Sequence, residues 1–153
     1  MIQNVKKILA PIDFSEHSME AMRAAMELAK DVGAEVHLVH VIAPHHTFIP
    51  LPLESNAEQS RELAREAAMI QQAEEELARL KKDEFGDSKN VFTFAVVGHP
   101  VQKLVDYAKE QAIDLIVMAT HGRSGIEHIL LGGTTEKLVR GAPCSVLVIR
   151  RKQ

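Results

Sequence analysis

Short apolar runs alternate with amphipathic segments along the chain of 153 residues. The runs are residues 8–10, 36–42, 91–97, 115–118 and 146–149. They are bounded by glycine, proline or polar residues, and they lack the polar alternation of a half-exposed strand. Such runs are typical of strands that are covered on both faces of a parallel sheet. The alternation of strands with helices therefore predicts an α/β fold, with a single domain spanning residues 1–153.

The segments between the runs have the spacing and the end signals of four helices. They extend from Ser15 to Gly33, from Asn56 to about Lys82, from Pro100 past Ala108, and from Thr134 to Gly141. Ser15 is a favourable N-cap, Gly33 terminates the first helix, and Pro100 fits a first helical turn. In the long second helix the predicted apolar stripe consists of Leu63, Ala67, Ile70, Leu77 and Leu80. We expect this stripe to face the sheet.

The charge and composition of the chain indicate which partners and which cellular compartment we expect. The net charge is −3 and charges of both signs are interspersed, so we expect no nucleic-acid partner. No apolar run is long enough to span a bilayer, and residues 1–7 lead into a strand without a signal peptide, so we expect a cytoplasmic protein with no membrane partner. Cys144 is the single cysteine, which agrees with a reducing compartment. The eight histidines include no H-E-x-x-H motif, so a metal site built from protein ligands alone is not expected.

A strand, a glycine-bearing loop and a helix N-terminus follow one another after Asp114. The loop contains Gly122, Gly132 and Gly133, and a Thr-Thr pair then opens the helix. In such a segment, unpaired backbone N–H groups and the positive end of the helix dipole point at one place. The segment therefore predicts an anion site, and phosphate is the expected ligand. Asp13 ends the first predicted strand at the same carboxyl edge of the sheet.

The loop contains neither the P-loop motif nor the G-x-G-x-x-G fingerprint of dinucleotide-binding folds. Its spacing is Ala119-x2-Gly122-x9-Gly132-Gly133. This spacing resembles the G-x2-G-x9-G-[ST] nucleotide-binding motif of the universal stress protein family. The chain departs from that motif at Ala119, which replaces a glycine, and at Gly133, which removes a hydroxyl. A neighbouring threonine, Thr134 or Thr135, has a hydroxyl that would take its place.

The resemblance extends over almost the whole chain. It includes Ile8–Ser15 around the first strand, His40-Val41 at the end of the second, and Ala142–Val148 near the C-terminus. It implies a Rossmann-like three-layer sandwich, similar to the adenine nucleotide α-hydrolase-like fold, with five parallel strands in the order 3-2-1-4-5. In that order the topological switch lies between the first and fourth strands, where doubly wound folds bind their ligands.

By resemblance, the nucleotide site comprises Pro11, Ile12, Asp13, Val41, Met118, Ala119, His121, Gly122, Arg123, Gly132, Gly133, Thr134 and Thr135. Pro11, Ile12 and Met118 would pack on the base, and Val41 would offer backbone groups to its edge. The glycines would let the backbone approach phosphate, with His121 and Arg123 in the same loop. Asp13 would contact the ribose or a phosphate-bound Mg²⁺, which prefers oxygen ligands.

The function implied by the resemblance is that of a universal stress protein that binds ATP, ADP or AMP with Mg²⁺ and acts as a nucleotide-dependent regulator. Homodimers would form through the last strand, residues 146–149. Two alternatives stay open, a slow ATPase and a stress protein that binds no nucleotide and acts through protein contacts. The motif supplies no evident general base, which favours binding over catalysis.

Overall fold

The computed structural model describes residues 4–44, 56–120 and 133–150. The strands are β1 (Lys7–Pro11), β2 (Glu35–Ile42), β3 (Val91–Val97), β4 (Leu115–Ala119) and β5 (Ser145–Ile149). The helices are α1 (Glu16–Val32), α2 (Asn56–Phe85), α3 (Pro100–Glu110) and α4 (Gly133–Gly141). The strands lie within a residue or two of the predicted runs. None of the described helices is both long and apolar enough to cross a bilayer.

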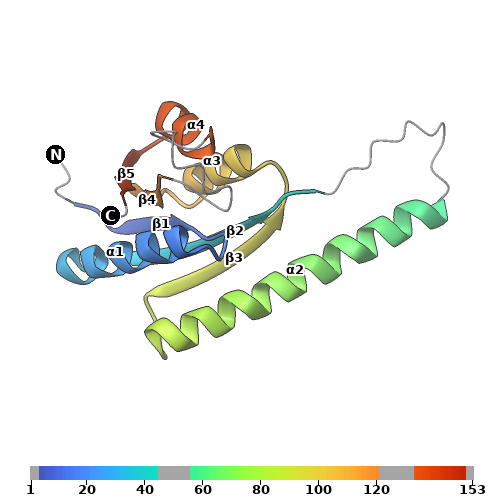
Figure 1. Ribbon diagram of the computed structural model, residues 1–153, viewed down its shortest axis with the longest axis horizontal. Coiled ribbons are helices and arrows are strands. Elements are labelled where there is room, and N and C mark those ends of the chain that lie inside the picture. Colours follow the sequence, from blue (N-terminus) through green and yellow to red (C-terminus); the bar gives the residue numbers. More distant parts are fainter. Residues whose placement is uncertain (1–3, 45–55, 121–132, 151–153) are drawn as a thin grey trace.

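The five strands form a parallel sheet in the order β3-β2-β1-β4-β5, which confirms the expected topology. Helices α1 and α2 cover one face of the sheet, and α3 and α4 cover the other (Figure 1). The result is the expected three-layer α/β sandwich.

Successive residues of β1 supply the two apolar cores. Ile8 and Ala10 pack in the cluster beneath α1 and α2, whereas Leu9 packs in the cluster beneath α3 and α4. All three side chains are fully buried. Because full burial of a Leu or Ile side chain contributes roughly 1.5–3 kcal/mol, β1 is a principal source of cohesion between the layers.

Helix α1 begins and ends where the sequence predicts. The Ser15 side chain accepts a hydrogen bond from the backbone N–H of Ser18, so it acts as the N-cap. At the other end Gly33 has φ of 71°, and its N–H bonds to the carbonyl of Ala29. A residue with a side chain is strained in this left-handed conformation, so glycine is required at this C-cap.

Helix α2 departs from the prediction over its N-terminal half. Leu77 is buried and Ile70 and Leu80 are partly buried against the sheet, but Leu63 is 67% exposed and Ala67 is also exposed. The expectation that the whole stripe faces the sheet was therefore wrong. The helix has 30 residues and is about 45 Å long, whereas the seven residues of β3 span about 23 Å. The N-terminal part of α2 consequently projects beyond the sheet (Figure 1).

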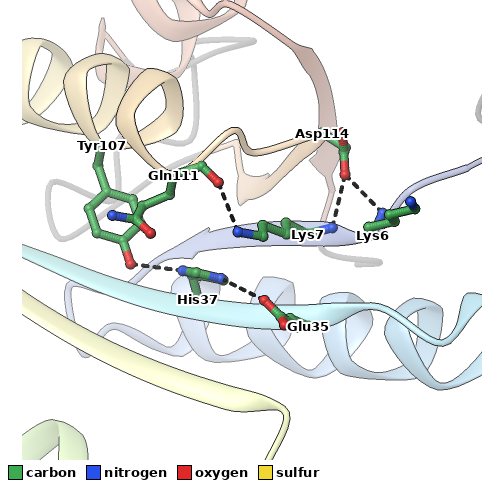
Figure 2. Close-up of polar contacts among 7 residues, drawn as sticks. All are labelled: Lys6, Lys7, Glu35, His37, Tyr107, Gln111 and Asp114. Carbon is green, nitrogen blue, oxygen red and sulfur yellow. Dashed lines mark hydrogen bonds and ion pairs between the residues drawn. The ribbon is translucent and has the colours of Figure 1, made fainter.

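Polar contacts fasten β1 to β4 at the amino edge of the sheet. Asp114 precedes β4, and its Oδ2 accepts hydrogen bonds from the backbone N–H groups of Lys6 at 2.8 Å and Lys7 at 3.0 Å (Figure 2). The Nζ of Lys7 also donates to the carbonyl of Gln111 at 3.2 Å. The sheet is therefore tied by side chains at the edge opposite the predicted ligand site.

We predict that Gly33→Ala lowers the free energy of unfolding by about 1 kcal/mol, because alanine is strained at positive φ. The melting temperature should then fall by about 2–4 °C for a chain of this size. The matched control is Gly141→Ala at the end of α4, where an added Cβ meets no atom within 4 Å. Thermal unfolding followed by circular dichroism measures both variants. Equal melting temperatures for the two would contradict the assignment of strain to Gly33.

Candidate functional site at the carboxyl edge

The pairing between β1 and β4 ends before either strand does. β1 pairs with β2 at five positions, from Lys7 to Pro11, but with β4 only at Ile8 and Leu9. From β1 the chain first adds β2 and β3 on one side and then β4 and β5 on the other. The topological switch point therefore lies between β1 and β4. We call the ends of β1, β2 and β4, with the residues that follow β1 and β4, the carboxyl edge. Doubly wound sheets bind ligands at such an edge.

A tight turn joins β1 to α1 and fixes the carboxylate of Asp13. Phe14 has φ of 62°, an uncommon conformation for a residue with a side chain. The N–H of Ser15 donates to Oδ1 of Asp13 at 2.9 Å, and the hydroxyl of Ser15 donates to the same oxygen. The N–H of Asp13 in turn donates to Oγ of Ser18 at 3.3 Å. The carboxylate is thereby held at the N-terminus of α1.

His40 also holds this turn, and the sequence did not indicate that role. Its Nδ1 lies 2.6 Å from the carbonyl oxygen of Ile12, which can only accept, so Nδ1 carries the proton. Its ring packs edge-on against Phe14, with centroids 4.9 Å apart. The only signal was the position of His40 at the end of β2. Because successive side chains of a strand alternate between its faces, the His40 side chain lies on the opposite face of β2 from that of His37, which contacts α3.

Val41 points its backbone groups past the end of β1. Alternate residues of a strand direct their N–H and C=O groups to the same side, and the carbonyl of Val39 accepts from Ile12 on the β1 side. Ile42 faces the other way, because its carbonyl accepts from Gly98 after β3. The donor and acceptor of Val41 therefore face the carboxyl edge beyond the last β1 pairing.

Thr135 fastens the start of α4 to the end of β4. Its side chain is buried at 3% exposure, and its hydroxyl donates to the carbonyl of Ala119 at 2.9 Å, with the carbonyl of Thr120 at 3.5 Å. The N–H of Thr120 donates to the carbonyl of Ile149 in β5. The first turn of α4 is consequently fixed at the carboxyl edge, where Gly133 and Thr134 are exposed.

The described members of the predicted site all lie at the carboxyl edge. They are Pro11, Ile12, Asp13, Val41, Met118, Ala119, Gly133, Thr134 and Thr135. Ile12 and Met118 are buried apolar side chains, whereas Thr134 is exposed. His121, Gly122, Arg123 and Gly132 lie outside the described residues.

The described part of the chain gives little support to a metal site or to a reactive cysteine. Its His, Cys, Asp and Glu side chains form no group of three that could hold a metal ion. Burial, with a smaller effect from Asp114, raises the pKa of the Cys144 thiol above its ordinary value. At neutral pH this cysteine is therefore protonated and poorly nucleophilic.

Comparison with known proteins identifies relatives over nearly the full length. A model of the universal stress protein family matches residues 4–150. The chain is 36% identical over 148 residues to universal stress protein MJ0531 of Methanocaldococcus jannaschii. The aligned part covers 95% of this chain and 82% of the relative.

Solved structures share the fold. Protein MJ0577 of the same organism superposes with a TM-score of 0.80 and 30% identity, over 97% of this chain and 98% of that one. A universal stress protein solved in complex with cAMP superposes with a TM-score of 0.60 over 95% of this chain and 97% of that one. Its identity is 21%, so this likeness concerns the fold.

Proposed function

The chain belongs to the universal stress protein family, and on this premise we propose that it binds an adenine nucleotide at the carboxyl edge and acts as a nucleotide-dependent regulator. The observation that carries the proposal is the early end of the β1–β4 pairing, beside the start of α4 that Thr135 fastens to β4. A ligand at this edge would have an acidic turn on one side and a helix N-terminus on the other. The universal stress protein solved with cAMP supports an adenine nucleotide as a ligand of this fold.

The phosphate groups would lie at the first turn of α4. The N–H groups of a helix start and the positive end of its dipole favour an anion there. Gly133 has no side chain to obstruct phosphate, and the exposed Thr134 has a hydroxyl that can donate. Thr134 would thus replace the hydroxyl that the motif places at position 133. Gly122, Arg123, Gly132 and His121 are proposed to complete this part of the site.

The base would lie over the ends of β1 and β4, near Pro11, Ile12 and Met118, with its edge at Val41. Adenine presents an amino donor next to a ring-nitrogen acceptor, and these match the C=O and N–H of one extended residue. Guanine presents a carbonyl acceptor and a ring N–H instead, so it mismatches the same pair of groups. Val41 would therefore select adenine over guanine through its backbone.

Asp13 would contact the ribose or a Mg²⁺ ion that the phosphates carry. Two hydrogen bonds from Ser15 to Oδ1 hold this carboxylate at the carboxyl edge. A magnesium ion bound here would keep most of its ligands as phosphate oxygens and water, which agrees with the lack of a protein metal cluster among the described residues. The single cysteine supports the further proposal that the protein works in the reducing cytoplasm.

We predict saturable one-to-one binding of ATP in isothermal titration calorimetry, with GTP weaker by about tenfold or more because two of its hydrogen-bonding groups are mismatched. Omitting Mg²⁺ should weaken ATP binding but leave adenosine binding unchanged. The absence of heat with any adenine nucleotide would refute nucleotide binding and favour action through protein contacts alone. Release of phosphate from bound ATP over hours would instead identify the slow ATPase.

A second prediction concerns Thr135, whose buried hydroxyl would position α4 without touching the ligand. Thr135→Val should weaken the binding of ATP by about tenfold, which is the equivalent of one hydrogen bond. The affinity for adenosine should stay unchanged, because only the phosphate subsite moves. Thr135→Ser retains the hydroxyl and should restore ATP affinity. If the valine variant binds ATP as tightly as the wild type does, Thr135 has no such role.

We further propose that two copies associate through β5, as the family resemblance implies. β5 lies at one edge of the sheet, and its Leu147 is 42% exposed, whereas residues 115–118 of β4 are all buried. An uncovered edge strand favours pairing with another chain, and a symmetric dimer satisfies that tendency.

We predict that Leu147→Lys converts the dimer into a monomer, because a charge would be buried at the interface. The control is Phe94→Lys on β3, which lies at the opposite edge and is similarly exposed at 40%. Sedimentation equilibrium at micromolar concentration measures the mass of each variant. Dimers that persist in the Leu147 variant but not in the Phe94 variant would move the interface to β3.

A further inference from the structure

His37 is a titratable side chain buried between β2 and α3, on the strand that also carries Val41 but nearer the amino edge. Its side chain is 5% exposed, and it lies between Tyr107 and Glu35 (Figure 2). Nothing in the proposed nucleotide site uses it. A buried histidine changes charge near neutral pH, so its surroundings decide whether the fold tolerates the proton.

The two ring nitrogens of His37 have different surroundings. Nδ1 lies 2.8 Å from the hydroxyl oxygen of Tyr107 on α3. Nε2 lies 3.5 Å from Oε2 of Glu35 on the same strand, and it has no hydrogen-bond partner among the described residues. The ring also lies against Phe92 of β3, with centroids 5.2 Å apart. One nitrogen therefore bridges to α3, and the other is buried near a carboxylate without a close bond.

The neutral ring fits this arrangement in one tautomer. With the proton on Nε2, the N–H points towards the carboxylate of Glu35, and Nδ1 accepts the hydroxyl proton of Tyr107. The opposite tautomer would place a bare Nε2 against the carboxylate. The neutral state therefore connects α3 to β2 by a hydrogen bond that Tyr107 donates.

A second proton reverses that bond. Nδ1 then becomes a donor, so the hydroxyl of Tyr107 must accept and its own proton must find another acceptor. The charged groups that face the ring are Glu35 from its own strand, which favours the proton, and Lys7 from β1, which opposes it, while β3 contributes the uncharged Phe92. Burial is the largest effect, and it lowers the pKa of His37 below the ordinary histidine value.

We propose that His37, Glu35 and Tyr107 form a proton-operated latch between β2 and α3. With a neutral ring the latch is closed. On protonation the bond to Tyr107 reverses, and the charged ring is accommodated by a local opening that admits water between α3 and the strands. Phe94 lies 5.0 Å from the Tyr107 ring and is already partly exposed, so the opening enlarges an exposed aromatic surface on β3 and α3.

The sign of the pH dependence follows from the difference between the two states. The open state has the ordinary histidine pKa of about 6.5, and the closed state has a lower one. Closure is therefore most favoured above pH 6.5 and weakens as the pH falls below it, until the closed state is protonated as well. Uptake of one proton limits the change to about tenfold per pH unit in the opening equilibrium.

The composition of the chain provides a probe at the latch itself. Tyr107 is the single tyrosine, and the chain has no tryptophan, so tyrosine fluorescence reports this one side chain. We expect a one-proton change in that fluorescence between pH 8 and pH 5, with a midpoint below 6.5. His37→Gln should abolish the change. The control His99→Gln, at an exposed position at the start of α3, should titrate as the wild type does.

Two further variants keep the test decisive if His37→Gln does not fold. Glu35→Gln removes the carboxylate that favours the proton, so the midpoint should fall. Lys7→Gln removes the charge that opposes it, so the midpoint should rise. A purely structural role for these residues would not produce shifts of opposite sign. A wild-type signal that does not change with pH, a titration that survives in His37→Gln, or shifts in the same direction would each overturn the latch.

Discussion

β1 is the strand on which the rest of the molecule depends, because it lies in the middle of the sheet with buried side chains on both faces. Ile8 and Ala10 belong to one core and Leu9 to the other, so any loss of β1 would uncouple the two helical layers. β1 also borders the topological switch point, because β2 and β3 lie on one side of it and β4 and β5 on the other. Its pairing with β4 at only two positions is what separates the strand ends at the carboxyl edge. The cohesion of the fold and the proposed ligand site therefore both depend on β1.

The amino edge and the carboxyl edge of the sheet have different roles. At the amino edge, Asp114 takes two backbone N–H groups of the β1 start, so β1 and β4 are held together there. At the carboxyl edge, β1 leads instead into a turn that Ser15 and His40 hold by hydrogen bonds, and Thr135 ties the start of α4 to the end of β4. Rigid turns on a buried scaffold are the usual setting of a binding site, because the loops are positioned without occupying the core.

The sequence predicted the elements and their order well, since apolar runs and helix caps are local signals. The apolar runs alone could not distinguish β4 from β5, because both are short and only their places in the sheet decide that β4 is covered and Leu147 exposed. The family resemblance supplied those places. Leu63 shows the same limit, since helical periodicity does not reveal where the sheet ends beneath the helix. The spacing of the motif also could not reveal that the hydroxyl of Thr135 bonds to the end of β4, because a ligand hydroxyl and a buried positioning hydroxyl have the same spacing.

The proposed latch and the proposed nucleotide site share strand β2, yet the packing between them argues against strong coupling. His37 and Val41 share a face of β2, and Val39 stands between them, buried and paired with both Pro11 and Phe94. Coupling between two sites requires an element with two arrangements that both sites bias. A strand fixed on both sides at Val39 is not such an element, whereas α3 would move at Tyr107 when the proposed latch opens. A proton at His37 should therefore alter the surface formed by β3 and α3 rather than the affinity for nucleotide.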